Sequence, residues 1–74
     1  MKFNYGNSIR VSKFAPIRYN PESVGALCGW RVVENEKTAI EFDVSIGAIL
    51  CNIEAPDGSF FEVPEEYLIK YEDN

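Results

Sequence analysis

Short segments in which apolar and polar residues alternate recur along this chain, and they restrict its fold more than any other feature. In the segment 8–14, Ile9 and Val11 alternate with polar residues, which places both apolar side chains on one face of a β-strand. Further strands are predicted at residues 23–33, 48–54, 59–63 and 68–71. Because so many strands in 74 residues must pair nearly all their edges, we expect a five-stranded, mainly β domain that spans residues 1–74 and closes into a small barrel.

The predicted second strand carries a long apolar face. Its members are Val24, Ala26, Cys28, Trp30 and Val32. We expect this face, Trp30 included, to pack into the core; the alternative is that Trp30 is exposed and contacts a partner. Gly25 and Gly29 interrupt the opposite face, where glycine is typical of a bulge or a sharp bend.

One segment departs from the period of two. Residues 36–42 are good helix formers, with Ala39 and Phe42 on one side, and Asn35 is suited to cap the N-terminus. A helix of about two turns is not stable alone, so it must dock on the sheet. The sequence therefore predicts one short helix between the second and third strands.

The connections carry clear turn signals. Pro56-Asp57-Gly58 predicts a tight hairpin, because glycine readily takes the left-handed conformation that the turn needs. Residues 64–67 begin with proline followed by two acids, which indicates a single helical or 3₁₀ turn. The segment 15–23 is predicted to be a loop, and its apolar Ile17 and Tyr19 are expected either to cover the core or to form part of a surface.

The composition excludes several kinds of chemistry. The chain has no histidine, which removes the usual general base and the usual zinc and haem ligand. Cys28 and Cys51 cannot form a structural zinc site alone, and we expect both thiols to be reduced and buried, with a disulfide as the alternative in an exported protein. No cofactor is predicted. Without a long apolar run or a signal-like start, the expected location is the cytoplasm, away from membranes.

Charge is divided unevenly along the chain. Residues 1–33 hold five cations and one carboxylate, whereas residues 34–74 hold two cations and eleven carboxylates, giving the net charge of −5. An acidic chain without a basic cluster is a poor match for phosphate backbones, which argues against nucleic acid as the partner. The acids of the helix and of the last turn are the candidates for contact with a basic protein: Glu41, Asp43, Glu65 and Glu66. The alternative is that they only keep the domain soluble.

The order of these elements resembles an SH3-like barrel. In that fold a long loop follows the first strand, a tight hairpin joins the third and fourth strands, and a 3₁₀ turn precedes the last strand. The corresponding segments here are residues 14–23, 55–59 and 64–68, with the helix as an insertion between strands two and three. Tyr19 and Trp30 are then candidate aromatic contacts, although the chain lacks the alternating tyrosines and paired tryptophans of peptide-binding SH3 domains.

A second likeness bears on function. The chain contains Gly25-x-x-Cys28-Gly29, Ala39-x-x-Phe42-x-Val44-x-Ile46-Gly47, Asp57-Gly58-Ser59 and Val63-Pro64-Glu65-Glu66. This pattern is similar to small bacterial proteins of SH3-like fold, some of which are predicted immunity proteins of polymorphic toxin systems. The resemblance implies a non-enzymatic, protein-binding role and carries over no catalytic residue; the partner it suggests is a basic toxin domain. The alternatives are a nucleic-acid-binding barrel and an accessory subunit of a larger complex.

Overall fold

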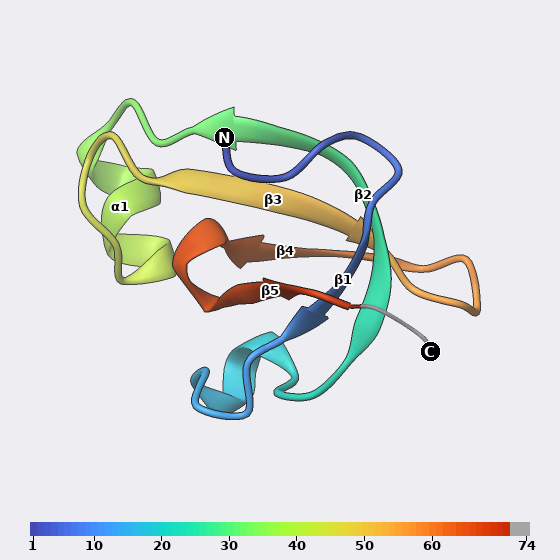
Figure 1. Cartoon of the computed structure of the whole chain (residues 1–74). Coiled ribbons are helices and arrows are strands. Elements are labelled where there is room, and N and C mark those ends of the chain that lie inside the picture. Colours follow the sequence, from blue (N-terminus) through green and yellow to red (C-terminus); the bar gives the residue numbers. More distant parts are fainter. Residues whose placement is uncertain (72–74) are drawn as a thin grey trace.

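The computed structural model describes residues 1–71 and contains one antiparallel sheet with a single α-helix beside it (Figure 1). The strands are β1 (Ser8–Val11), β2 (Val24–Val32), β3 (Ile49–Glu54), β4 (Phe60–Pro64) and β5 (Leu68–Lys70). The helix is α1 (Glu36–Phe42), and the 3₁₀ turns are η1 (Ile17–Tyr19) and η2 (Glu65–Tyr67).

The sheet is open. Its strand order is β4-β3-β2-β1-β5, so β4 and β5 form the two edges of the described sheet. The prediction of a mainly β domain with five strands and one helix between β2 and β3 is confirmed. The expected closure into a barrel is not observed, because no pairing joins the two edges within residues 1–71.

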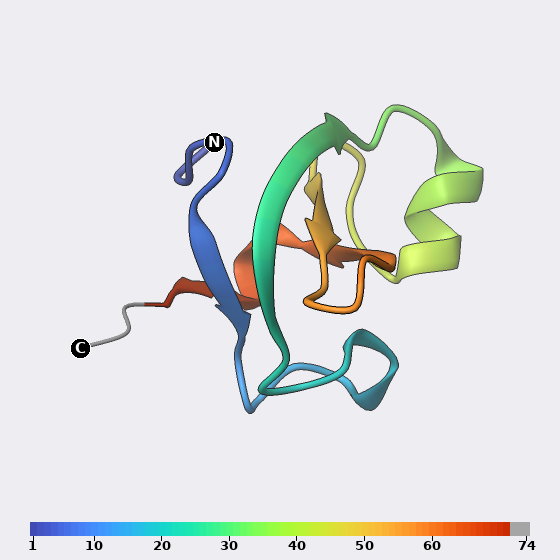
Figure 2. The same ribbon diagram turned by 90° about the vertical axis from the view of Figure 1, so that its right-hand side faces the viewer.

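Strand β2 bends across the sheet and joins its two halves (Figure 2). It pairs with β1 through Val24–Ala26 and with β3 through Ala26–Val32. The register shifts between Leu27 and Gly29, which leaves Cys28 as the extra residue of a bulge. The bend that the glycines of this strand predicted is therefore present.

Gly25 lies where β2 passes closest to the end of β3. A Cβ atom placed on Gly25 would sit 2.5 Å from the carbonyl oxygen of Glu54 and 2.6 Å from Cγ2 of Ile53. Both distances are far inside van der Waals contact, so only glycine fits without a shift of the backbone.

The core lies on the inner face of the bent sheet, and a smaller cluster lies under the helix. The inner cluster consists of Phe3, Ile9, Val11, Ala15, Tyr19, Leu27, Cys51, Ile53, Val63 and Leu68. On the opposite face of β3, Leu50 packs with Val33 and with Ala39 of α1. Because successive strand residues point to opposite faces, β3 is buried on both sides, which explains its nearly continuous apolar sequence.

The predicted burial of Trp30 is wrong. Trp30 is 46% exposed and Val32 is 50% exposed, whereas Leu27, which the alternation assigned to the other face, is completely buried. The bulge after Leu27 shifts the alternation by one residue, so Leu27 and Trp30 lie on the same side of the sheet, opposite the buried Ile53 and Cys51. The shift accounts for the burial of Leu27, whereas Trp30 is exposed because little covers that end of the strand. Strand β1 pairs only with Val24–Ala26, so the far end of β2 has a strand on one side only.

The short helix forms as predicted. The backbone N–H of Thr38 donates to Oδ1 of Asn35 at 2.8 Å, which is the expected N-cap bond. At the other end Asp43 takes the left-handed conformation (φ 53°) and donates its N–H to the carbonyls of Ala39 and Ile40. The helix therefore stops at Phe42, the last residue of the predicted segment.

The predicted turns are also present, with small shifts of strand ends. Gly58 has φ 88°. Oδ1 of Asp57 accepts the Ser59 hydroxyl at 2.6 Å and the Ser59 N–H at 2.9 Å, and these two bonds lower the pKa of the Asp57 carboxyl. The first strand ends at Val11 rather than residue 14, because the N–H of Ala15 turns back to the carbonyl of Ser12.

Candidate binding surface

A groove runs between the connection from α1 to β3 and the turn η2. It has a volume of about 730 Å³ and is lined by residues 43–49 on one side and residues 64–66 on the other. Three carboxylates line it, those of Asp43, Glu65 and Glu66, together with the side chains of Ile46 and Ile49. We call it the acidic groove, because its lining residues in the described chain include no lysine or arginine.

The α1 wall of the acidic groove is held by the loop that contains η1. Nη2 of Arg18 donates to the carbonyl oxygen of Glu41 at 2.6 Å, and the Tyr19 hydroxyl donates to the carbonyl oxygen of Phe42 at 2.7 Å. These are among the last carbonyls of α1, which lack partners inside the helix. The Arg18 guanidinium also lies 5.9 Å from the centre of the Phe42 ring. This anchoring fixes the end of α1, and with it the position of Asp43.

The η2 wall is fixed from two directions. The backbone N–H of Lys2 donates to Oε2 of Glu65 at 3.0 Å, and the carbonyl oxygen of Tyr67 accepts the N–H of Ser12 at 2.7 Å. The Tyr67 ring also stacks on the ring of Tyr19, with centroids 5.8 Å apart. Glu65 is half-buried by these contacts, whereas Glu66 is exposed.

The structure brings together three of the six residues proposed as partner contacts. Asp43, Glu65 and Glu66 meet in the acidic groove, although the first lies more than twenty residues from the other two. Glu41 is exposed on α1 but does not line the groove. Tyr19 is buried in the core, so its ring is not available as a surface contact and its hydroxyl serves the helix end instead.

Trp30 lies in a separate, smaller hollow. Its lining is Gly29, Trp30, Arg31, Asn52 and Glu62. Nε and Nη2 of Arg31 donate to the two carboxylate oxygens of Glu62 at 2.9 and 3.0 Å, and this bond raises the pKa of the guanidinium. Trp30 is therefore a partly exposed aromatic, as the alternative interpretation had it, but it is not part of the acidic groove.

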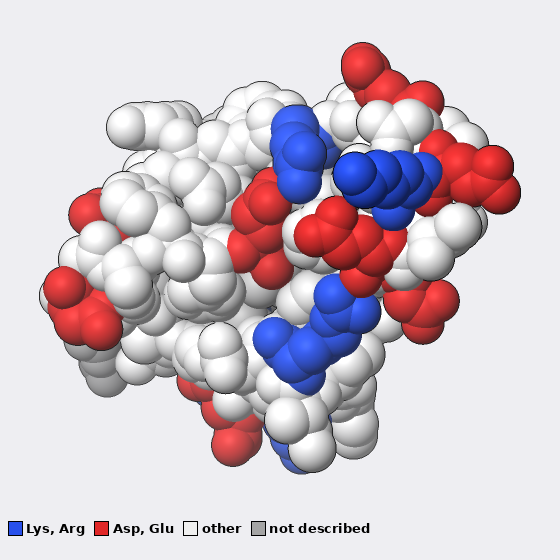
Figure 3. All heavy atoms as spheres, turned by 180° about the vertical axis from the view of Figure 1, so that it is seen from behind, with Lys and Arg blue, Asp and Glu red and all other residues white. Residues whose placement is uncertain are grey.

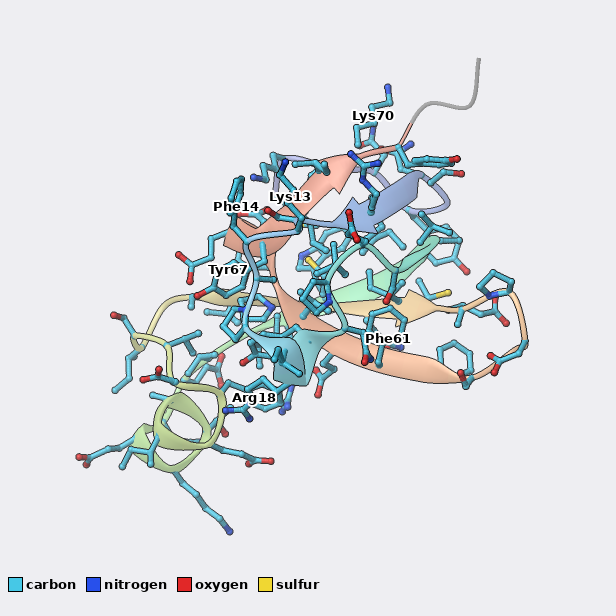
Figure 4. The ribbon with its side chains drawn as sticks, turned by 90° about the horizontal axis from the view of Figure 1, so that it is seen from below. Lys13, Phe14, Arg18, Phe61, Tyr67 and Lys70 are labelled. Carbon is cyan, nitrogen blue, oxygen red and sulfur yellow. The ribbon has the colours of Figure 1, made fainter. Side chains whose placement is uncertain are left out.

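On the rear face of the molecule, charged side chains concentrate at one end. Seen from behind, cations and carboxylates gather over the α1 end, whereas the half toward the β3–β4 turn is mostly uncharged with acids at its margin (Figure 3). Figure 4 shows Arg18 on the side of the sheet that faces α1. The α1 end thus offers charge for recognition, and the acidic groove is its purely acidic part.

Both cysteines are free, but their surroundings differ. Cys51 is buried in the core, and burial raises the pKa of its thiol to about 11. Cys28 is half-buried in the bulge, with Sγ 3.9 Å from Oε1 of Glu54. The expectation of burial holds for Cys51 and only in part for Cys28.

Two further features of residues 1–71 bear on other classes of site. No group of three or more aspartate, glutamate or cysteine side chains there is arranged to hold a metal ion. None of the helices in that part of the chain is long and apolar enough to cross a membrane.

Comparisons with protein-family models, with curated proteins and with solved structures found no match to this chain.

Two apolar residues of the groove were not among the sequence-based candidates. Ile46 is 61% exposed and Ile49 is half-buried, and both line the acidic groove. The signal for Ile46 was available, because a large apolar side chain next to Gly47 in a short connection is unusual. Ile49 belongs to the alternating apolar pattern of β3, so its sequence position does not mark it as a surface residue.

Proposed function

We propose that this chain is a non-enzymatic protein-binding module whose main contact is the acidic groove. The observation that carries the proposal is the convergence of Asp43, Glu65 and Glu66 around the exposed Ile46. Carboxylates around an apolar side chain suit a partner segment that presents lysine or arginine beside an apolar residue.

The arrangement of strands supports the same kind of module. Strand order β4-β3-β2-β1-β5, the bent β2 and the single 3₁₀ turn between β4 and β5 fit an SH3-like topology in an open form. Domains of this shape present connections at one end of the sheet as a binding surface. We propose that the α1–β3 connection and η2 have this role here.

The chemical groups of the groove favour binding over catalysis. Its functional side chains are three carboxylates and the Ser45 hydroxyl, and all lie on surface connections. The buried thiol of Cys51 stays protonated at neutral pH because burial raises its pKa to about 11. We propose a basic toxin domain, neutralised in the cytoplasm, as a partner that would present such lysine or arginine side chains.

The proposal is tested by titrating the protein with a blocked synthetic peptide in which leucines alternate with lysines. Asp43→Asn and Glu66→Gln should each weaken binding by about two- to fivefold at low salt, mainly through slower association. Asparagine is suited to position 43, because it tolerates the left-handed backbone there.

Glu34→Gln is the matched control, since it removes one exposed carboxylate outside the groove. It should leave the affinity within the error of the measurement. Equal losses in all three variants would mean that only net charge matters, and the acidic groove would not be the contact. Salt-sensitive binding of oligouridine in preference to the basic peptide would overturn the proposal.

A further inference from the structure

A third hollow, lined by cations as well as apolar side chains, lies over the outer face of β1 and β5. It has a volume of about 420 Å³ and is lined by Arg10, Ser12, Lys13, Phe14, Glu22 and Ile69. Arg10 and Ile69 are directly opposite each other in the β1–β5 pairing, and both are exposed. We call this region the basic hollow.

The loop after β1 displays large apolar side chains to solvent. Phe14 is 83% exposed and Ile17 is 88% exposed. The Lys13 ammonium lies 5.2 Å from the centre of the Phe14 ring, and Figure 4 shows both side chains projecting from the loop on the β5 side. Exposed apolar side chains interleaved with cations are typical of a contact surface rather than of a solvated loop.

This loop is held in place, so the exposure of Phe14 is a fixed feature. The N–H of Phe14 donates to Oγ of Ser12 at 3.1 Å, and the neighbouring Ala15 is buried. The other end of the loop is tied by the N–H of Glu22, which donates to the carbonyl of Val11 at 2.8 Å. A contact segment whose backbone is already ordered loses less conformational entropy on binding.

Glu22 adds an independent observation. Its φ is 72°, a left-handed conformation that is unfavourable for a glutamate. Such conformations concentrate at binding and catalytic sites, where the surrounding structure imposes them. Here the imposed conformation sets a single carboxylate at the rim of a hollow that also carries Arg10 and Lys13.

We infer that the basic hollow is a second docking surface, for an extended protein segment that presents carboxylates on either side of an apolar residue. Phe14 and Ile69 would receive the apolar side chain, and Arg10 and Lys13 would pair with the carboxylates. The carboxylate of Glu22 disfavours phosphate-dense ligands such as RNA, since these gain affinity chiefly from many cations together.

The test is a titration with a blocked hexapeptide in which leucine and phenylalanine are flanked on each side by two acidic residues. Arg10→Gln and Lys13→Gln should each weaken its binding by about three- to tenfold, and Phe14→Ser by about tenfold. Glu22→Gln should strengthen binding by about two- to threefold, because it removes the carboxylate that lines the basic hollow and repels the peptide. A gain of affinity cannot arise from partial unfolding, so this variant separates binding from stability.

Lys37→Gln is the matched control, because it removes an exposed cation of α1 outside the basic hollow. It should leave the affinity for the hexapeptide unchanged. Asp43→Asn and Glu66→Gln should do the same, so failure of this inference is distinguishable from failure at the acidic groove.

Four results would overturn the inference. The first is equal affinity for a hexapeptide with glutamine and asparagine in place of its acids. The second is oligouridine binding that depends on Arg10 and Phe14 and is tighter than hexapeptide binding. The third is binding to anionic vesicles through Phe14. The fourth is self-association, seen by sedimentation and removed by Arg10→Gln, because the occupant would then be a second copy of the chain.

Discussion

Two glycines of β2 differ sharply in what surrounds them. At Gly25 an added Cβ would overlap the carbonyl oxygen of Glu54, whereas at Gly29 it would meet nothing within 4 Å. Neither residue has a positive φ, so backbone strain does not separate them. Of these two glycines, the close passage of β2 over the end of β3 therefore depends on Gly25.

Gly25→Ala should lower the free energy of unfolding by about 1–3 kcal/mol, because the clash involves backbone and cannot be relieved by a side-chain rotation. Gly29→Ala is the matched control and should be neutral or stabilising by about 0.5 kcal/mol, since alanine suits a strand better than glycine. Urea unfolding followed by circular dichroism measures both. Equal midpoints for the two variants would show that β2 does not pass β3 as closely as inferred.

The buried thiol of Cys51 should make stability depend on pH in the alkaline range. Its pKa rises from the ordinary 9.0 to about 11, so the folded protein keeps a proton that the unfolded chain releases. Stability should therefore fall as the pH increases from about 9 to about 11. Cys51→Ala should show a smaller fall in urea midpoint over this interval. The buried phenol of Tyr19, whose pKa is also raised by burial, titrates in both proteins and cancels in the comparison.

At the scale of elements, the two 3₁₀ turns and the helix support one another. Tyr19 of η1 donates its hydroxyl to the last residue of α1 and stacks on Tyr67 of η2. None of the three elements is long enough to be stable alone. The walls of the acidic groove thus depend on a buried tyrosine that does not touch the groove itself.

Tyr19→Phe should lower the free energy of unfolding by about 1 kcal/mol. The carbonyl of Phe42 loses its hydrogen-bond donor, while the ring stack on Tyr67 is retained. The loss should be concentrated at the C-terminal end of α1, where amide hydrogen exchange should become faster than in the parent. Tyr67→Phe keeps the same stack and serves as control. Uniform acceleration of exchange across the sheet would contradict a local role.

The elements that could be predicted from the sequence are those set by neighbouring residues. Asn35 and the helix formers after it specify α1, and Pro56-Asp57-Gly58 specifies the hairpin, because their bonds join residues within one turn. The exposure of Trp30 depends on how far β1 extends along β2, and the openness of the sheet depends on whether β4 and β5 pair. No local pattern contains that information.

The candidate site divides in the same way. The acids of the helix end and of η2 were recognisable as an excess of charge, but their meeting depends on the docking of α1 through Tyr19. The burial of Tyr19 depends on the path of the loop that carries it, so no periodic pattern of apolar residues predicts it. The ion pair of Arg31 with Glu62 joins residues 31 positions apart and has no sequence signal.

At the scale of the whole molecule, the uneven charge along the chain becomes two distinct surfaces. The acidic groove is formed by residues from the second half of the chain, and the basic hollow is formed mainly by residues from the first half. The two surfaces share no residue, although η2 connects them through the bond from Ser12 to Tyr67. We propose that one partner of each charge binds at the same time, because the two surfaces are separate.

The two sites should therefore bind independently. With the lysine–leucine peptide at saturation, the affinity for the acidic hexapeptide should change by less than about twofold once direct binding between the peptides is subtracted. Asp43→Asn together with Glu66→Gln should weaken only the first peptide, and Arg10→Gln together with Lys13→Gln only the second. Raising the salt concentration should weaken both, since exposed charges are screened beyond about 10 Å at moderate ionic strength. Competition between the peptides on the protein would show that they share one surface, and the division of the molecule into an acidic and a basic site would then be wrong.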